Sequence, residues 1–217
     1  MSGKKIVQYI PDYVVFDLET TGISPVKDEV IEISAVKVRE GKVVDTFSSL
    51  VNPGRSIPWA ASSVNHITDE MVSDAPAMQV VLQEFMRFVG DDVLVGHNIH
   101  SFDMKFIQRD ARRFLDKEIE NDYIDTLQLA RKCLPQLSHH RLVDISAFFE
   151  FSTEGAHRAL NDCMMNQKCF EEMAKIQSTK RVVVCPKCGG ELLKRNGKFG
   201  VFMGCSNFPT CRYTENC

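Results

Sequence analysis

The chain has 217 residues, 44% of them hydrophobic and 25% charged, with a net charge of −3 at pH 7. This composition is that of a folded globular protein and excludes a disordered chain, and the length allows one full-sized domain plus a small one. No stretch approaches the ~20 apolar residues that span a bilayer, and no signal peptide follows Met1, so we expect a cytoplasmic protein without a membrane partner.

The first half of the chain is predicted to begin with three strands. Residues 13–18 form a short aromatic and β-branched run that indicates a buried strand, and residues 30–39 alternate as a half-buried strand. A turn at Gly41 leads into a third strand over 43–51, which predicts an antiparallel meander. Residues 53–75 are expected to form a long loop with short helical turns.

Helices and strands are predicted to alternate after this meander. A helix over 76–89 has Ser73 or Asp74 available as its cap. Further strands are predicted at 93–95 and 123–125, and further helices at 102–115, 126–133, 142–149 and 159–176. This order predicts an α/β fold with a mixed sheet flanked by helices. The polar stretch 177–181 places a domain boundary between residues 178 and 179.

Two acidic residues stand two positions apart on the first predicted strand. Asp17 and Glu19 therefore leave the same face of the sheet, near the carboxyl end of the strand, where α/β folds place ligands. An Asp-x-Glu pair alone is more often a solvent-facing alternation. The turn that follows, Thr20 to Gly22, offers free backbone amides to a ligand.

A second group of candidate residues lies near the starts of two predicted helices. Asp103 is close to the start of one helix, where the helix dipole alone would favour a carboxylate. His157 and Asp162 flank a loop-to-helix junction, where a histidine is more often a cap or a solvated side chain. A neutral histidine beside bound metals is also a suitable general base, because its pKa lies near 7.

Four carboxylates in one pocket would repel one another and lose hydration. Divalent cations resolve that conflict. If Asp17, Glu19, Asp103 and Asp162 converge, the sequence predicts a two-metal centre for phosphoryl transfer.

Order, spacing and local context make these separate signals resemble one known family. The matching segments are Val-Phe-Asp-Leu-Glu-Thr-Thr-Gly at 15–22, Val-Asn-Pro-Gly-Arg-Ser-Ile-Pro at 51–58, Asn-His-Ile-Thr-Asp-Glu-Met-Val at 65–72, Gly-His-Asn-Ile-His-Ser-Phe-Asp at 96–103 and His-Arg-Ala-Leu-Asn-Asp at 157–162. They resemble the DEDDh-type 3′→5′ exonucleases, close to the proofreading subunit epsilon and the exonuclease domains of bacterial replicative polymerases. The resemblance covers about 13–176.

The resemblance implies a ribonuclease-H-like fold with a five-stranded mixed sheet. It implies two Mg²⁺ or Mn²⁺ ions held by the four carboxylates named above, with His157 deprotonating the attacking water. Candidate contacts to the terminal nucleotide are Leu18, Thr20, Phe102 and His66. His66 is the weakest of these, because the motif reads Asn-His-Ile-Thr where many relatives have His-Gly-Ile-Thr. Packing, caps and surface suffice for the other histidines, His97, His100, His139 and His140.

Two pairs of thiols lie within 33 residues near the end of the chain, at Cys185, Cys188, Cys205 and Cys211. A segment this short cannot build a core alone, and four thiolates predict one structural Zn²⁺. Buried unpaired cysteines would fit so polar a segment poorly. By contrast, Cys133, Cys163 and Cys169 fall in helical patterns and are expected to be packing residues; Cys217 is expected to be free.

The segment 185–213 resembles the C-terminal zinc ribbons of bacterial type IA topoisomerases, which implies single-stranded DNA binding. Residues 179–217 carry a net charge of +5 against −8 for the rest, which suits a nucleic-acid partner. Basic residues alternate there with Phe199, Phe202, Phe208 and Tyr213, of which some must fill the ribbon's own core.

The sequence thus predicts an exonuclease domain at 1–178 and a zinc ribbon at 179–217 that grips the strand being trimmed. DNA is favoured because both resemblances point to it. An RNA 3′ exonuclease is the first alternative, and a catalytically inactive nucleic-acid-binding module is the second. A polymerase or repair partner and the oligomeric state stay open.

Overall fold

The computed structural model describes residues 3–178, 183–197 and 200–216. Its strands are β1 (Tyr13–Thr20), β2 (Val30–Arg39), β3 (Lys42–Leu50), β4 (Leu94–Gly96), β5 (Tyr123–Asp125), β6 (Leu192–Gly197), β7 (Gly200–Cys205) and β8 (Thr214–Asn216). Its helices are α1 (Trp59–Asn65), α2 (Asp69–Val72), α3 (Met78–Val89), α4 (Asp103–Leu115), α5 (Thr126–Cys133), α6 (Leu142–Phe148) and α7 (Ala159–Ser178). The predicted element order is confirmed, with boundaries within two residues for most elements.

The central sheet has five strands in the order β3-β2-β1-β4-β5. β1 to β3 form the predicted antiparallel meander, whereas β4 and β5 run parallel to β1. The sheet is therefore mixed, as predicted. Because parallel strands end together, the carboxyl ends of β1, β4 and β5 meet at one edge of the sheet.

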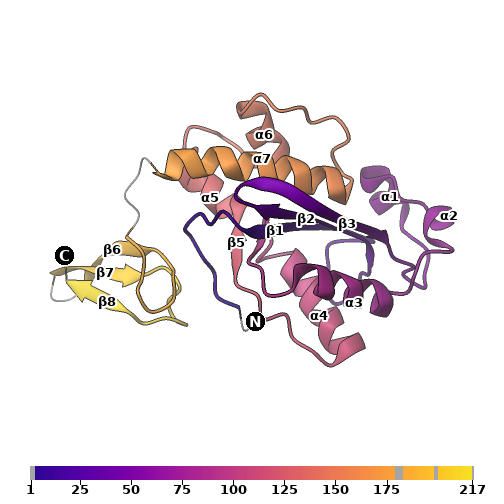
Figure 1. The fold of residues 1–217 in the computed structure, drawn as a ribbon, viewed down its shortest axis with the longest axis horizontal. Coiled ribbons are helices and arrows are strands. Elements are labelled where there is room, and N and C mark those ends of the chain that lie inside the picture. The colour runs from indigo at the N-terminus through magenta and orange to yellow at the C-terminus, as the bar shows by residue number, and fades with distance from the viewer. Residues whose placement is uncertain (1–2, 179–182, 198–199, 217) are drawn as a thin grey trace.

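Helices cover both faces of this sheet, α3 and α4 on one side and α5 to α7 on the other (Figure 1). Phe16 and Leu18 of β1 pack with α3 and α4, while Tyr13 and Val15 pack with α7. A fully buried side chain of this size contributes about 1.5–3 kcal/mol. Since side chains alternate along a strand, Asp17 falls on the α7 face with Tyr13 and Val15.

Two local predictions are wrong. β2 is not half-buried, because α7 covers the face on which Glu32 and Ser34 lie, and both residues are nearly inaccessible. α3 has no side-chain cap from Ser73 or Asp74; its cap residue is Ala77. Pro76 holds the chain extended just before the helix, which keeps those two side chains away from the first-turn amides.

The C-terminal part is a three-stranded antiparallel sheet in the order β6-β7-β8. It lies beside the N-terminal segment of the body (Figure 1), where the Asn207 amide donates to the Lys5 carbonyl at 3.3 Å and Lys132 pairs with Glu191. The domain boundary predicted after residue 178 adjoins 179–182, which lie outside the described residues. Across the described part of the chain, none of the helices is long and apolar enough to cross a bilayer.

Candidate active site

Three carboxylates from two elements meet at the carboxyl end of β1. Asp17 and Glu19 come from the strand, and Asp162 comes from the first turn of α7, which packs on that face. One oxygen of each lies within 4.8 Å of the others, a separation at which they could share a cation. The spacing of two on β1 therefore places both side chains as the sequence predicts.

Asp103 approaches the same pocket from the other side of the sheet edge. It is the first residue of α4, directly after the turn that follows β4, and it is 2% exposed. The charge on Asp103 is the largest electrostatic contribution that raises the pKa of Asp17. The structure thus brings all four predicted carboxylates into one electrostatic group, although Asp103 lies outside the tighter cluster of three.

The pKa values of these carboxylates show the cost of gathering them. Burial, and then repulsion from Asp103 and Asp162, raise the pKa of Asp17 well above its usual range. Burial and the charges of Asp162 and Glu32 raise the pKa of Glu19 to about 8. Burial raises the pKa of Asp103 to about 7, although backbone amides at Asp103 and Leu18 oppose it. Burial and mutual repulsion thus favour protonation of these carboxylates when no cation balances their charge.

Glu32 is a fifth acidic residue at the pocket that sequence reasoning missed. It lies opposite Glu19 in the β1–β2 ladder and is 3% exposed. Its carboxylate accepts hydrogen bonds from Arg158 Nη2 at 2.9 Å and from the Ala159 amide at 3.2 Å. The Arg158 guanidinium gives Glu32 a positive partner, and both bonds tie the start of α7 to β2. A glutamate among buried apolar residues was the available signal, but the alternation of β2 made it look solvent-facing.

His157 lies at the exposed mouth of the pocket, just before α7. Its backbone has φ of 67°, in the left-handed region, and its amide donates to Asp162 Oδ2 at 3.1 Å. A non-glycine residue in this conformation is costly and persists only where its surroundings fix it. The bond to Asp162 provides that constraint and keeps His157 beside the carboxylates.

The predicted nucleotide-binding residues surround the same strand end. Leu18 is buried against α3 and α4, so mainly its backbone is available to a ligand. The Thr20 hydroxyl donates to the Gly22 carbonyl at 2.6 Å and shapes the turn after β1. A Cβ on Gly22 would lie 2.5 Å from the Asp28 carboxylate, so a larger residue there would have to displace that side chain. Phe102 is partly exposed and packs against Phe106 at the start of α4, with the two rings tilted at 51°.

Asn65, rather than His66, is directed toward the carboxylates. His66 is exposed at the end of α1 with φ of 60°. Asn65 is 2% exposed, and its amide donates to the Thr20 carbonyl at 3.4 Å and bonds to the Glu19 side chain, which lowers the pKa of Glu19. His66 has the left-handed backbone that glycine would adopt most easily, which is consistent with the motif difference at this position.

Three of the four histidines without a predicted role have packing or hydrogen-bonding partners. His100 stacks on Tyr123 and shares a 2.6 Å hydrogen bond with its hydroxyl. His140 bonds to the Leu134 carbonyl at 2.9 Å, and His97 bonds to Thr126 at 3.2 Å. His139 is exposed.

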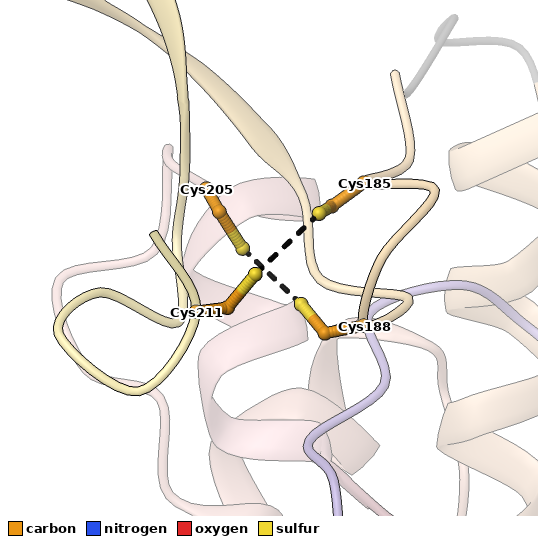
Figure 2. Close-up of side chains that lie close together, drawn as sticks. All are labelled: Cys185, Cys188, Cys205 and Cys211. Atoms are coloured by element: carbon orange, nitrogen blue, oxygen red, sulfur yellow. Dashed lines mark hydrogen bonds between the residues drawn. The ribbon is translucent and has the colours of Figure 1, made fainter. Parts of the chain in front are cut away.

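The four cysteines of the ribbon converge as predicted, and Figure 2 shows their sulfurs pointing toward one centre. The Cys185–Cys211 and Cys188–Cys205 sulfur distances are 3.8 and 3.3 Å. These are far above a disulfide bond length of ~2.05 Å. They are close to the edge of about 3.8 Å that a tetrahedral zinc site has with Zn–S bonds of ~2.3 Å. Cys133, Cys163 and Cys169 are buried packing residues, also as predicted.

Both groups of side chains suit the metals that the sequence predicts. Carboxylate oxygens are the ligands that Mg²⁺ and Mn²⁺ prefer, and four thiolates form a closed structural zinc site. The raised pKa values fit a pocket in which cations replace protons. The structure places hard and soft ligands in separate parts of the molecule, so each metal has its own donor set.

A mixed five-stranded sheet with clustered carboxylates at the end of β1 defines a nuclease of the ribonuclease-H-like class. Residues 14–170 match the family model described as Exonuclease, and residues 182–217 match that of the topoisomerase DNA binding C4 zinc finger. The chain belongs to the exonuclease family and, within it, is similar to the DEDDh-type 3′→5′ enzymes.

Two curated relatives illustrate the similarity. DNA polymerase III subunit epsilon of Aquifex aeolicus is 40% identical over 158 residues, which cover 73% of this chain and 78% of that protein. DNA polymerase III PolC-type of Oceanobacillus iheyensis is 42% identical over 154 residues, or 71% of this chain. The match spans only 11% of the length of that PolC-type protein.

Solved structures agree on the fold. Exonuclease X in complex with 5′-overhanging duplex DNA superposes with a TM-score of 0.58 at 28% identity, covering 77% of this chain and 92% of that one. Escherichia coli exonuclease I in complex with a dT13 oligonucleotide gives a TM-score of 0.69 at 15% identity, covering 94% of this chain and 54% of that one. The second likeness shows the fold alone.

Proposed function

We propose that the protein is a metal-dependent exonuclease that removes nucleotides from the 3′ end of single-stranded DNA and releases nucleoside 5′-monophosphates. The observation that carries this proposal is the convergence of Asp17, Glu19 and Asp162 within 4.8 Å, with Asp103 in the same electrostatic group. Membership of the exonuclease family supports hydrolysis of a phosphodiester by this group.

The four carboxylates would hold two Mg²⁺ or Mn²⁺ ions. When bound, such a pair supplies positive charge that stabilises the attacking and leaving oxygens of an in-line displacement. His157 would accept the proton of the attacking water, because it lies exposed at the pocket mouth and its backbone is fixed to Asp162. The amide of Asn65 would keep Glu19 oriented.

The terminal nucleotide would lie against the end of β1. We assign to it the backbone of Leu18, the turn at Thr20, the ring of Phe102 and the loop that carries His66. Phe102 is the apolar, partly exposed surface on which a base could stack.

DNA is the proposed substrate for two reasons. The ribbon matches a zinc finger described as DNA binding, and Exonuclease X was solved with DNA. The ribbon would assist by binding the strand, with Phe208, 61% exposed, as a stacking surface. The proposed domains are 1–178 and 179–217.

The test uses 5′-labelled single-stranded DNA and RNA of one sequence, incubated with Mg²⁺ and either wild type or Asp17→Ala. The proposal predicts a ladder that shortens from the 3′ end of the DNA with wild type and no ladder with the variant. Glu118→Ala, which removes an exposed acidic side chain just after the end of α4, is the control and should cleave normally. Trimming of RNA alone would contradict DNA as the substrate. Cleavage by Asp17→Ala would contradict the assignment of the carboxylate cluster as the active site.

A further inference from the structure

A cleft with cationic walls opens on the α5 side of the molecule. Its volume is about 490 Å³, and its walls include His97, Asn98, Arg131, His139 and Arg141. His97 follows β4 directly, and β4 is the parallel neighbour of β1. The cleft therefore starts at the same sheet edge as the carboxylate pocket.

The charge of this cleft is opposite to that of the pocket. Among the described residues that line it, none is acidic. The contrast is sharp because the rest of the body carries an excess of acidic residues. A cationic recess beside an acidic one suits a ligand with several negative charges of which only one reaches the metals.

Arg131 is the cation best placed to meet such a ligand. It is exposed in the last turn of α5 and forms no ion pair or hydrogen bond within the described residues. Arg141 is instead engaged with Asp144 through two bonds of 2.8 Å. An unpaired guanidinium is the group that recognises phosphate oxygens most effectively.

The cleft is held in shape by hydrogen bonds of His97. Its Nδ1 bonds to the Thr126 hydroxyl at 3.2 Å, and that hydroxyl bonds to Asn166 Oδ1 at 2.8 Å. The His97 ring also bonds to the His140 backbone. These bonds join the turn after β4, the start of α5 and the loop before α6. Asn166 stands one helical turn after Asp162, so the same network reaches the helix of the metal site.

We propose that this cleft binds one backbone phosphate of the DNA strand, with the Arg131 guanidinium as its counter-charge. The inference rests on the proposed function, because it takes the reacting 3′ end to lie at the carboxylates. From there the strand can extend only in its 5′ direction, so the phosphate belongs to an upstream linkage. Arg131 would thus contribute to holding a polymer and not to cleaving its last bond.

The first test compares Arg131→Gln with Arg87→Gln, the same charge change on the exposed side of α3 across the sheet. For a single-stranded DNA 10-mer we expect KM to rise about 5-fold in Arg131→Gln, with kcat unchanged. The slope of log KM against log salt should fall by about 0.7. Turnover of the p-nitrophenyl ester of thymidine 5′-monophosphate, which has no upstream phosphate, should not change. Arg87→Gln should match wild type throughout.

A second test locates the phosphate. One neutral methylphosphonate is moved along a labelled 10-mer, and affinity is measured by fluorescence anisotropy. Wild type should lose affinity at one upstream linkage, and Arg131→Gln should show no further loss there. Equal loss at every linkage in both proteins would overturn the proposal, as would the same KM change in Arg87→Gln.

The two proposals fail in different ways. If neither wild type nor Arg131→Gln hydrolyses the ester or the 10-mer, the proposed function fails. The anisotropy measurements still show whether the cleft binds a backbone phosphate. If both proteins cleave alike and bind alike, the function stands and the cleft proposal fails. Arg131 also lies where a positive charge stabilises the end of a helix. The melting temperature of the Arg131→Gln protein is therefore compared with that of the Arg87→Gln protein.

Discussion

At the scale of single residues, protons and cations would compete for the four clustered carboxylates. The pKa of Glu19 is raised to about 8 and that of Asp103 to about 7, chiefly by burial. A cation requires the ionised carboxylates, so its binding releases protons. The pocket should therefore respond strongly to pH in the range where enzymes work.

We predict that the affinity for Mn²⁺ rises with pH between about 6 and 9. Each proton released on binding adds up to tenfold per pH unit, so at least about a tenfold gain is expected from pH 6.5 to 8.5. Calorimetric titration in buffers of different ionisation enthalpy would count the protons. A pH-independent affinity would show that the carboxylates are already ionised in the free protein.

The stability of the cation-free protein should change in the opposite sense. A carboxylate whose folded-state pKa is raised contributes stability that is present below its unfolded pKa and is lost as pH rises through the folded value. For Glu19 and Asp103 this stability is lost between about pH 4 and about pH 8. We expect the melting temperature without added Mg²⁺ to fall from pH 6 to 9. The melting temperature of Asp17→Asn, which lacks one of the repelling charges, should fall less over the same pH range.

Arg158 is expected to be more important for stability than its half-exposed position suggests. Its loss would leave the buried Glu32 carboxylate without its ion-pair partner among the other acids, at a cost of about 1–3 kcal/mol. Urea unfolding of Arg158→Ala should show this loss, and Arg158→Ala with Glu32→Gln should recover much of it. If the double variant is no more stable than the single one, the pair has no such role.

At the scale of elements, the sequence predicted what local periodicity controls. The spacing of two placed Asp17 and Glu19 on one face, because alternation is a property of the strand itself. Bringing Asp103 and Asp162 to them depends on how α4 and α7 pack, and local pattern contains no such information. Their convergence could be expected only from the family resemblance.

The residues that sequence reasoning missed are polar groups buried by long-range packing. The alternation of β2 predicted that Glu32 faces solvent, but α7 covers it. Asn65 was not predicted, because its neighbour His66 was chosen as the contact to the terminal nucleotide. Both lie in segments where the burial of one side chain depends on an element far along the chain. Such positions are where tertiary contacts override a local pattern.

The zinc ribbon is the element whose folding should depend on a metal. Its apolar cluster consists of the cysteines with Leu192, Met203 and Tyr213, which is too small to fold a domain alone. Zinc supplies on the order of 10 kcal/mol in comparable sites. We predict that Cys205→Ser loses bound zinc and the ribbon strands while the body keeps its melting transition. Zinc content and circular dichroism check this, with Cys133→Ala, a buried cysteine of the body, as the matched control.

At the scale of the whole molecule, the distribution of charge suits strand binding in one region and hydrolysis in another. The ribbon segment is basic and the body is acidic, with the Arg131 cleft as a local exception. A strand would thus be attracted by the ribbon and the cleft, and only its reacting end would reach the carboxylates. Raising salt should weaken binding of long strands much more than turnover of the mononucleotide ester.

The measurement that tests the central claim most directly is a Mn²⁺ titration of the zinc-loaded protein at pH 8, followed by electron paramagnetic resonance. The account predicts that wild type binds two Mn²⁺ ions per chain and that Asp17→Asn loses at least one of them. An isotherm of Asp17→Asn that matched wild type, or no bound Mn²⁺ in either protein, would contradict a two-metal site at these carboxylates.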